Sequence, residues 1–134
     1  SIFTHYKRKE DVAMKSGKLD EELCRMNDIA ENIKSNSLLL LNESFAATNE
    51  REGSEIAGQI IRALMEKHIK IFYVTHLYEL AHNFYDKNKQ NVIFLRAERK
   101  SDGKRTYKII EGEPLQTSYG KDIYNNLFET EKEN

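Results

Sequence analysis

The sequence predicts an α/β fold with a mainly parallel sheet, flanked by helices and closed by a C-terminal antiparallel hairpin. Two short apolar runs, at residues 38–41 and 71–74, alternate with stretches in which apolar residues recur every three or four positions. This strand–helix–strand–helix order is typical of a parallel sheet with right-handed crossovers. An Asp-Gly pair at residues 102–103 separates two later strand-like runs and indicates a hairpin, so the expected sheet is mixed.

The helices are expected from periodicity and from their capping residues. An amphipathic pattern runs from Leu19 to Ile33. Ser54 is the expected N-cap of a second helix, whose apolar stripe extends to Met65. Two shorter helices are expected at about residues 77–85 and 119–128.

The strands are expected from short apolar or alternating runs. The run at residues 38–41 is continuous and has polar residues on both sides, so we expect a strand covered on both faces. The strands of the hairpin are expected at residues 92–97 and 106–110.

Composition limits the classes of function. The 134 residues fit one domain, and their 21 basic and 22 acidic side chains give a formal charge of −1 without a basic stripe, which argues against direct DNA binding by this chain. The single cysteine, Cys24, cannot form an internal disulfide, which is typical of proteins in the reducing cytoplasm. No apolar run is long enough to cross a membrane. The chain starts at Ser1 without a methionine, so we expect it to be a piece of a longer protein.

A polar pair follows the first apolar run. Asn42 and Glu43 come directly after it, which places their side chains at the carboxyl edge of the sheet, where open α/β folds bind ligands. In nucleotide hydrolases this is the Walker B position: the first polar residue helps to hold magnesium, and the following glutamate orients and deprotonates the attacking water. Taken alone, residues 38–43 are more simply explained as a strand that runs into a polar loop.

A histidine follows the second apolar run. His76 comes two residues after this run ends, so it should lie at the same sheet edge as Glu43. A histidine there can donate a hydrogen bond to a γ-phosphate and report which nucleotide is bound. A lone histidine is more often a surface or core residue, but the pairing with Glu43 favours a functional role.

Three blocks in order along the chain, at residues 38–53, 75–80 and 118–120, resemble the MutS mismatch-repair family, a branch of the ABC-type ATPases. In that family ten residues follow the Walker B glutamate and end in Asp-Gly. The stretch 44–53 has the same length, with Thr48 and Gly53 in register and Glu52 in place of the aspartate.

The other two blocks support the same resemblance. Residues 75–80 match the Thr-His-x-x-Glu-Leu pattern around the family's switch histidine. The Ser-Tyr-Gly triplet at residues 118–120 follows the closing hairpin, as it does in MutS proteins. Residues 2–4 are also similar to the strand that precedes the family's signature loop.

The resemblance implies a partial P-loop NTPase fold of the ABC/MutS type over residues 1–134, with ATP and Mg²⁺ as ligands. It implies a homodimer through the ATPase domain, in which ATP binding and hydrolysis are coupled to mismatched DNA held by domains outside this chain. Glu43 would be the general base, His76 the γ-phosphate sensor and Asn42 the residue on the magnesium side. The remaining implied site residues are Ser16, Gly17 and Lys18, which would reach the partner's nucleotide, and Thr48 and Asn49, which would communicate across the dimer.

The chain departs from the family pattern in three places. Asn42 stands where MutS proteins usually have aspartate, which should weaken metal binding. The signature loop is replaced by residues 15–19, where Gly17 takes the place of the usual serine. No Gly-x-x-x-x-Gly-Lys-[Ser/Thr] loop is present, so the chain by itself is expected to hydrolyse little or no ATP.

Two alternatives stay open at this point. The chain could come from another ABC-class DNA-repair or SMC-like ATPase, a class whose long coiled coils require heptads that this chain lacks. It could also be a module that binds ATP and dimerises without hydrolysis, with Asn42 as the mark of lost activity. The other histidines, His5, His68 and His82, have no metal-ligand spacing and are expected to be solvated.

Overall fold

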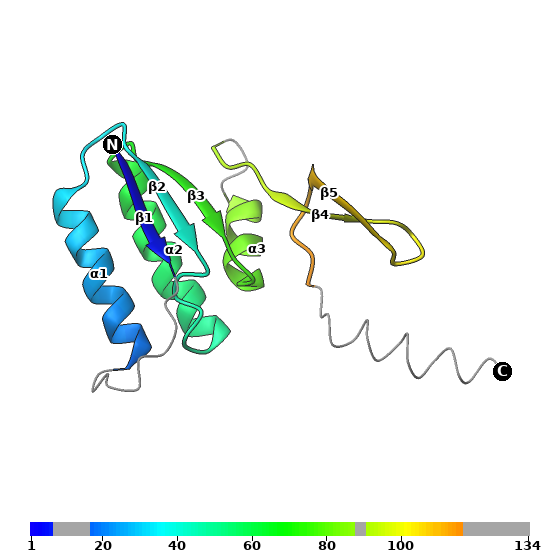
Figure 1. The fold of residues 1–134 in the computed structure, drawn as a ribbon, viewed down its shortest axis with the longest axis horizontal. Coiled ribbons are helices and arrows are strands. Elements are labelled where there is room, and N and C mark those ends of the chain that lie inside the picture. Colours follow the sequence, from blue (N-terminus) through cyan, green and yellow to red (C-terminus); the bar gives the residue numbers. More distant parts are fainter. Residues whose placement is uncertain (7–16, 88–90, 117–134) are drawn as a thin grey trace. The chain divides into compact units, whose positions relative to one another are not determined.

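The computed structural model describes residues 1–6, 17–87 and 91–116, which form two compact units that divide between Leu80 and Ala81. Figure 1 shows the elements in chain order. They are β1 (Ile2–Tyr6), α1 (Lys18–Asn32), β2 (Leu38–Asn42), α2 (Glu50–Glu66), β3 (Lys70–Val74), α3 (Tyr78–Lys87), β4 (Leu95–Arg99) and β5 (Arg105–Glu111). The helix and the Ser-Tyr-Gly triplet expected after residue 117 lie outside the described residues. None of the helices within residues 17–87 is long and apolar enough to cross a membrane.

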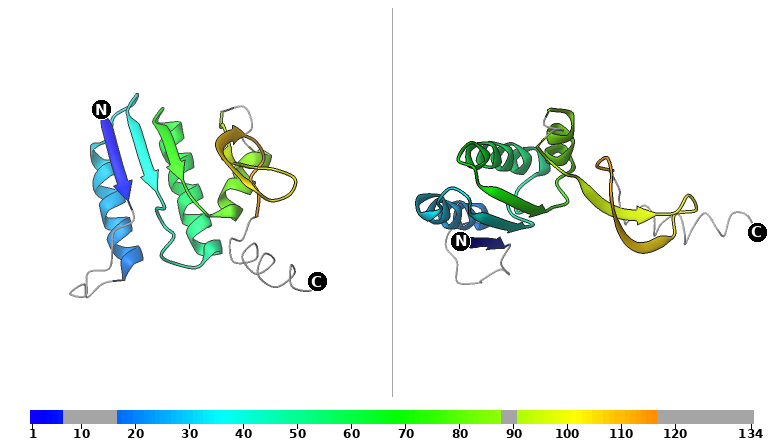
Figure 2. Two further views of the ribbon diagram at one scale, coloured as in Figure 1. Left: turned by 45° about the vertical axis from the view of Figure 1, so that its right-hand side comes forward. Right: turned by 90° about the horizontal axis from the view of Figure 1, so that it is seen from above.

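The first unit contains a three-stranded parallel sheet in the order β1-β2-β3. Leu39 of the central strand lies opposite Phe3 on one side and Ile71 on the other. Right-handed crossovers between successive neighbouring strands place both connecting helices on one face of the sheet. Figure 2 shows α1 and α2 on the same face. The pairing of the three strands confirms the predicted parallel arrangement.

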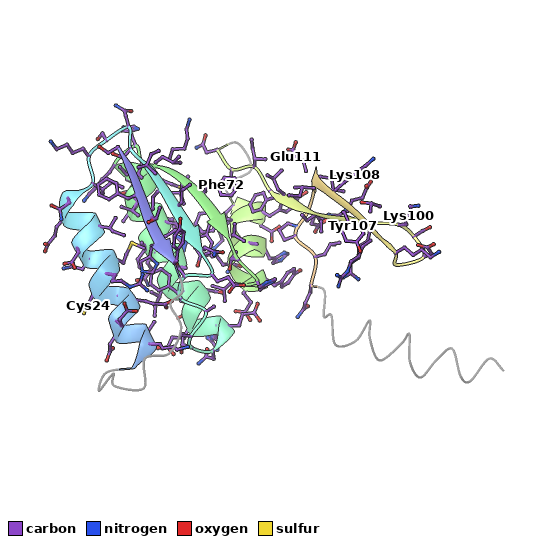
Figure 3. All side chains as sticks on the ribbon, viewed as in Figure 1. Cys24, Phe72, Lys100, Tyr107, Lys108 and Glu111 are labelled. Atoms are coloured by element: carbon purple, nitrogen blue, oxygen red, sulfur yellow. The ribbon has the colours of Figure 1, made fainter. Side chains whose placement is uncertain are left out.

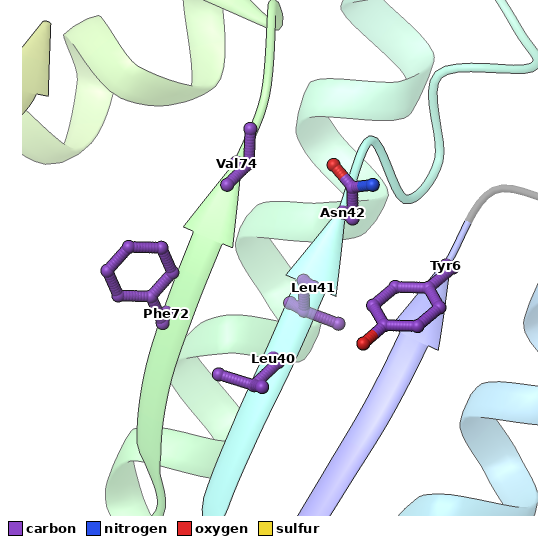
Figure 4. A pocket seen from close by; sticks show the side chains of 6 residues that line it. All are labelled: Tyr6, Leu40, Leu41, Asn42, Phe72 and Val74. Carbon is purple, nitrogen blue, oxygen red and sulfur yellow. The ribbon is translucent and has the colours of Figure 1, made fainter.

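The two faces of this sheet differ in burial. Leu39 and Leu41 point toward the helices and are 0% and 1% exposed. Leu40 points the opposite way and is only partly buried, and Phe72 beside it on β3 is 55% exposed. Figure 4 shows that a shallow pocket on this open face is lined by side chains of all three strands, including Tyr6. The prediction that residues 38–41 are covered on both faces is therefore wrong for the described residues, because α1 and α2 cover one face only.

The second helix begins earlier than predicted. Asn49, not Ser54, is the N-cap of α2, and its side-chain oxygen accepts a hydrogen bond from the backbone N–H of Glu52 at 2.9 Å. Glu50 and Glu52 in the first turn are favoured by the helix dipole. The apolar stripe starts only at residue 56, so periodicity gave no sign of this polar first turn. Ser54 is instead a buried residue inside the helix.

The second unit contains the predicted hairpin, in which β4 and β5 pair antiparallel. At its turn Gly103 has a φ of 84°, a backbone conformation that favours glycine, and Asp102 accepts a hydrogen bond from the N–H of Lys104. The two strands form a sheet of their own, so the described residues contain two separate sheets where we expected one mixed sheet. Figure 3 shows the hairpin side chains, among which Tyr107 is 90% exposed. The α/β class, with parallel strands and an antiparallel hairpin, is confirmed.

The two faces of β2 give a direct stability test. We expect Leu39→Ala to lower the free energy of unfolding by about 2–5 kcal/mol, because it leaves a cavity under the helices. Leu40→Ala in the same strand should cost clearly less, because Leu40 already contacts solvent on the open face. Urea unfolding of both variants measures the difference, and equal losses would contradict the assignment of faces.

Candidate active site

The carboxyl ends of β2 and β3 bring the predicted polar residues to one edge of the sheet. Asn42 is the last residue of β2 and its side chain is exposed. The backbone N–H of Glu43 donates to the carbonyl oxygen of Val74 at 2.8 Å, which continues the parallel hydrogen-bonding pattern one residue beyond the strands. Residues that follow Val74 are thereby held beside Glu43.

The two predicted catalytic residues are in contact. Nε2 of His76 lies 3.3 Å from Oε1 of Glu43, and their side chains are 76% and 38% exposed. The turn that carries His76 is shaped by Thr75, whose hydroxyl accepts a hydrogen bond from the N–H of Leu77 at 2.9 Å. The structure thus joins an acid and a histidine from neighbouring strands at a solvent-accessible edge.

The loop after Glu43 has an unusual backbone conformation. Glu43 and Phe45 have φ values of 52° and 65°, in the left-handed region that residues with a Cβ rarely adopt. Between them, the carbonyl oxygen of Ser44 accepts a hydrogen bond from the hydroxyl of Tyr73. Burial raises the pKa of Tyr73, so the phenol stays protonated and remains a donor. Tertiary contacts therefore hold a loop that its own backbone preferences do not favour.

Gly53 lets α2 approach this loop closely. A Cβ at position 53 would lie 2.4 Å from the carbonyl oxygen of Phe45, which is closer than real Cβ atoms come to other atoms. Phe45 itself is fully buried. This close approach is a physical reason for the glycine that ends the ten-residue stretch after Glu43.

Thr48 and Asn49 lie where this loop enters α2. Asn49 is the N-cap, and the hydroxyl of Thr48 donates to the carboxylate of Glu52 at 2.7 Å. Both residues therefore have a local role in starting the helix, and their predicted role across a dimer stays a prediction.

Gly17 and Lys18 lie on a different element. Gly17 is the N-cap of α1 and Lys18 is its first residue, while Ser16 lies outside the described residues. Figure 1 shows the N-terminal ends of α1 and α2 at the same edge of the sheet as the carboxyl ends of the strands. Cys24, further along α1, is exposed (Figure 3).

His5 differs most from what its sequence context predicts. It was expected to be solvated, but it is fully buried, and its ring stacks on that of Phe45 with centroids 5.4 Å apart. Nε2 lies 2.9 Å from the carbonyl oxygen of Glu22, and Nδ1 lies 2.6 Å from the hydroxyl of Ser44. The signal that could have found it is alternation along β1, which places His5 on the same face as Phe3.

The protonation state of His5 follows from its surroundings. Burial lowers its pKa below the ordinary value of 6.5, so the ring is neutral at pH 7. A carbonyl oxygen can only accept, so Nε2–H donates to Glu22, while Nδ1 and the backbone carbonyl oxygen of His5 lie 2.6 and 3.0 Å from the hydroxyl oxygen of Ser44. Neutral His5 therefore bridges α1 and the loop after β2.

The fold is that of a partial nucleotide-binding domain, with polar groups at the carboxyl edge of parallel strands, where such domains place their ligands. The family model of MutS domain V matches residues 1–128. The chain therefore belongs to the MutS family of mismatch-repair ATPases, and the match covers the ATPase domain of that family. This assignment favours MutS over the SMC-like alternative.

Two glycines of α2 test the close approach of this helix to the loop. We expect Gly53→Ala to lower the free energy of unfolding by about 1–3 kcal/mol, because the new methyl group meets backbone that must shift. At position 58 the nearest atom to an added Cβ is the end of the Arg62 side chain, 3.0 Å away, which can move. Gly58→Ala should therefore be neutral or stabilise by up to about 1 kcal/mol. Thermal and urea unfolding compare the two, and a tolerated Gly53→Ala would contradict the contact.

The buried histidine predicts a pH dependence of stability. The pKa of His5 is lower in the folded than in the unfolded chain, so the unfolded state binds more protons below about pH 6.5 and stability falls as the pH falls. We expect His5→Gln to make the decrease in unfolding free energy between about pH 7 and 5 smaller, by at most about 1.4 kcal/mol per pH unit. His68→Gln, at an exposed position, is the matched control for replacing a histidine that is not buried. An unchanged slope in His5→Gln would show that His5 does not titrate differently on folding.

Proposed function

We propose that this chain supplies the hydrolytic half of a MutS-type ATPase site, with Glu43 as general base, His76 as γ-phosphate sensor and Asn42 on the magnesium side. In the full-length protein, ATP binding and hydrolysis would be coupled to binding of mismatched DNA by other domains.

The contact between Glu43 and His76 carries this proposal. A carboxylate and an imidazole from adjacent strands lie 3.3 Å apart at the edge where α/β domains bind ligands. The carboxylate is 38% exposed, so water can reach it. A general base needs this access, together with hydrogen-bond distance to the proton that it accepts.

The side chains present fit a magnesium nucleotide. Asn42 offers an amide oxygen, which is a ligand type that Mg²⁺ accepts, directly or through a water molecule. Bound MgATP would supply the γ-phosphoryl group and the charge that polarises it. The loop that would surround the other phosphates has no counterpart in this sequence, so residues outside this chain must provide it.

The remaining roles concern protons and position. Glu43 would orient a water molecule and accept its proton during attack, while the exposed His76 would be free to turn from the carboxylate toward a phosphate oxygen. The backbone of Glu43 is held by its hydrogen bond to Val74, which keeps the carboxylate at the sheet edge.

The proposed assembly is a homodimer in the cytoplasm. Ser16, Gly17 and Lys18, at and before the N-terminus of α1, would reach the partner's nucleotide, since a helix N-terminus favours phosphate. Thr48 and Asn49 would form the link across the dimer at the start of α2. DNA would be bound by domains outside this chain.

One observation supports a second candidate, a module that binds ATP and dimerises without hydrolysing it. Asn42 puts a neutral amide where the family usually has a carboxylate, which removes one negative charge next to the proposed metal. Weaker metal binding could leave a nucleotide-gated clamp with little turnover.

ATP hydrolysis by the full-length protein, with and without duplex DNA, tests the first candidate. We expect Glu43→Ala to lower kcat by about 10²-fold or more, because the proton acceptor is lost, with ATP binding retained. Glu66 is an exposed acid at the C-terminal end of α2, so Glu66→Ala is the matched control and should leave kcat unchanged. Full activity in Glu43→Ala would refute the general base.

Substitution at the metal side separates the two candidates. If the wild-type protein hydrolyses ATP, Asn42→Asp should lower the Mg²⁺ concentration needed for half-maximal activity, because it restores a charged ligand. A wild-type protein that binds ATP without turnover, and gains turnover in Asn42→Asp, would establish the non-hydrolysing clamp instead.

A further inference from the structure

A buried carboxylate on α1 holds the loop that follows Glu43. Glu22 is 2% exposed, and its Oε2 accepts a hydrogen bond from the backbone N–H of Phe45 at 3.0 Å. A carboxylate that is removed from water is costly unless hydrogen bonds compensate for the lost hydration. The contact joins residues 23 positions apart, and Phe45 lies only two residues beyond Glu43.

His5 strengthens the same connection from β1. Its ring donates to the backbone carbonyl of Glu22 and is hydrogen-bonded to the hydroxyl of Ser44, which also contacts the backbone carbonyl of His5. The side chains of His5, Glu22 and Ser44 are all buried, so these hydrogen bonds are shielded from solvent. The start of α1 is thereby tied to both residues that follow Glu43.

The loop needs this support because of its backbone. Positive φ at a residue with a Cβ persists only where the surrounding structure enforces it, and both Glu43 and Phe45 have it. The Glu22 carboxylate accepts from the N–H of Phe45, and Gly53 lies close to the carbonyl oxygen of the same residue. Removing the acceptor would let the loop relax and move the carboxylate of Glu43.

We propose that Glu22, supported by His5, is a positioning residue that sets the orientation of Glu43 for attack on ATP, an inference that rests on the proposed function. In this role Glu22 does not act on the substrate directly. It acts through the Phe45 N–H and the turn at residues 43–46. A misplacement of reacting groups by about 1 Å can cost about 10²-fold in rate, so a single hydrogen bond at this position is enough to affect catalysis.

Two substitutions at position 22 separate the hydrogen bond from side-chain shape. Glu22→Met keeps the length of the side chain but has no oxygen, whereas Glu22→Gln keeps an oxygen that can accept from Phe45 N–H. In the full-length protein we expect Glu22→Met to lower kcat by about tenfold or more, with KM within about twofold, and Glu22→Gln to stay within about threefold of wild type. Glu31→Met and Glu31→Gln, at an exposed position on the same helix, are the matched controls and should be unchanged.

The outcomes distinguish this inference from the proposed function. Wild-type turnover that disappears in Glu43→Ala establishes the proposed function without reference to Glu22. Against that background, full kcat in Glu22→Met, or equal loss in the Met and Gln variants, would overturn the positioning role alone. If Glu22→Met does not fold, amide hydrogen exchange decides in wild type and Glu22→Gln: slow exchange at Phe45 supports the contact, and fast exchange contradicts it.

Mixed dimers show in which subunit Glu22 acts. When one subunit carries Glu43→Ala, hydrolysis comes from the other subunit. Glu22→Met in the hydrolysing subunit should lower turnover about tenfold, and in the Glu43→Ala subunit it should change turnover less than about twofold. The reverse pattern would mean that Glu22 acts through Gly17 and Lys18 on the partner's nucleotide, and it would overturn the inference.

Discussion

The central place of β2 in the parallel sheet decides where each polar group of the candidate site lies. β2 pairs with β1 on one side and with β3 on the other, so its register determines which residues of both neighbours lie at each end of the sheet. Leu39 and Leu41 fix that register, because a slip of one residue would turn them from the helices toward the open face. Once it is fixed, the first residues beyond β2 and β3 must meet at one edge, and the contact between Glu43 and His76 follows.

The loop after β2 is the second constraint, and it depends on three elements at once. α1 supplies the Glu22 carboxylate, β3 supplies the Tyr73 hydroxyl, and α2 approaches through Gly53. Each contact meets the backbone between residues 43 and 46, where the chain has a conformation that it does not adopt easily. A loop held by three elements in this way suits a site that must place one carboxylate accurately.

Much of the fold could be predicted from the sequence, and the exceptions have physical causes. Apolar periodicity begins near Ser54 and predicts the start of α2 there, whereas Asn49 caps the helix before a polar first turn that has no periodic signal. The run at residues 38–41 consists of four leucines and therefore predicts a strand covered on both faces. The sequence does not show which helices or strands lie against each face. The hairpin was correctly predicted from its Asp-Gly turn, while its sheet is separate from the parallel one.

For the candidate site, the sequence by itself determined which residues end the strands: an acid after one apolar run and a histidine after the next, at spacings that resemble MutS proteins. Local chemistry is enough for this, since strand ends and motif spacing are properties of neighbouring residues. Only the tertiary structure decided that His5 is buried and that Glu22 bonds to Phe45, because these partners are 17 to 39 positions apart and meet through strand pairing and helix packing. The local sequence does not show which distant donor a buried carboxylate will bond to. The packing of α1 against the sheet determines that partner.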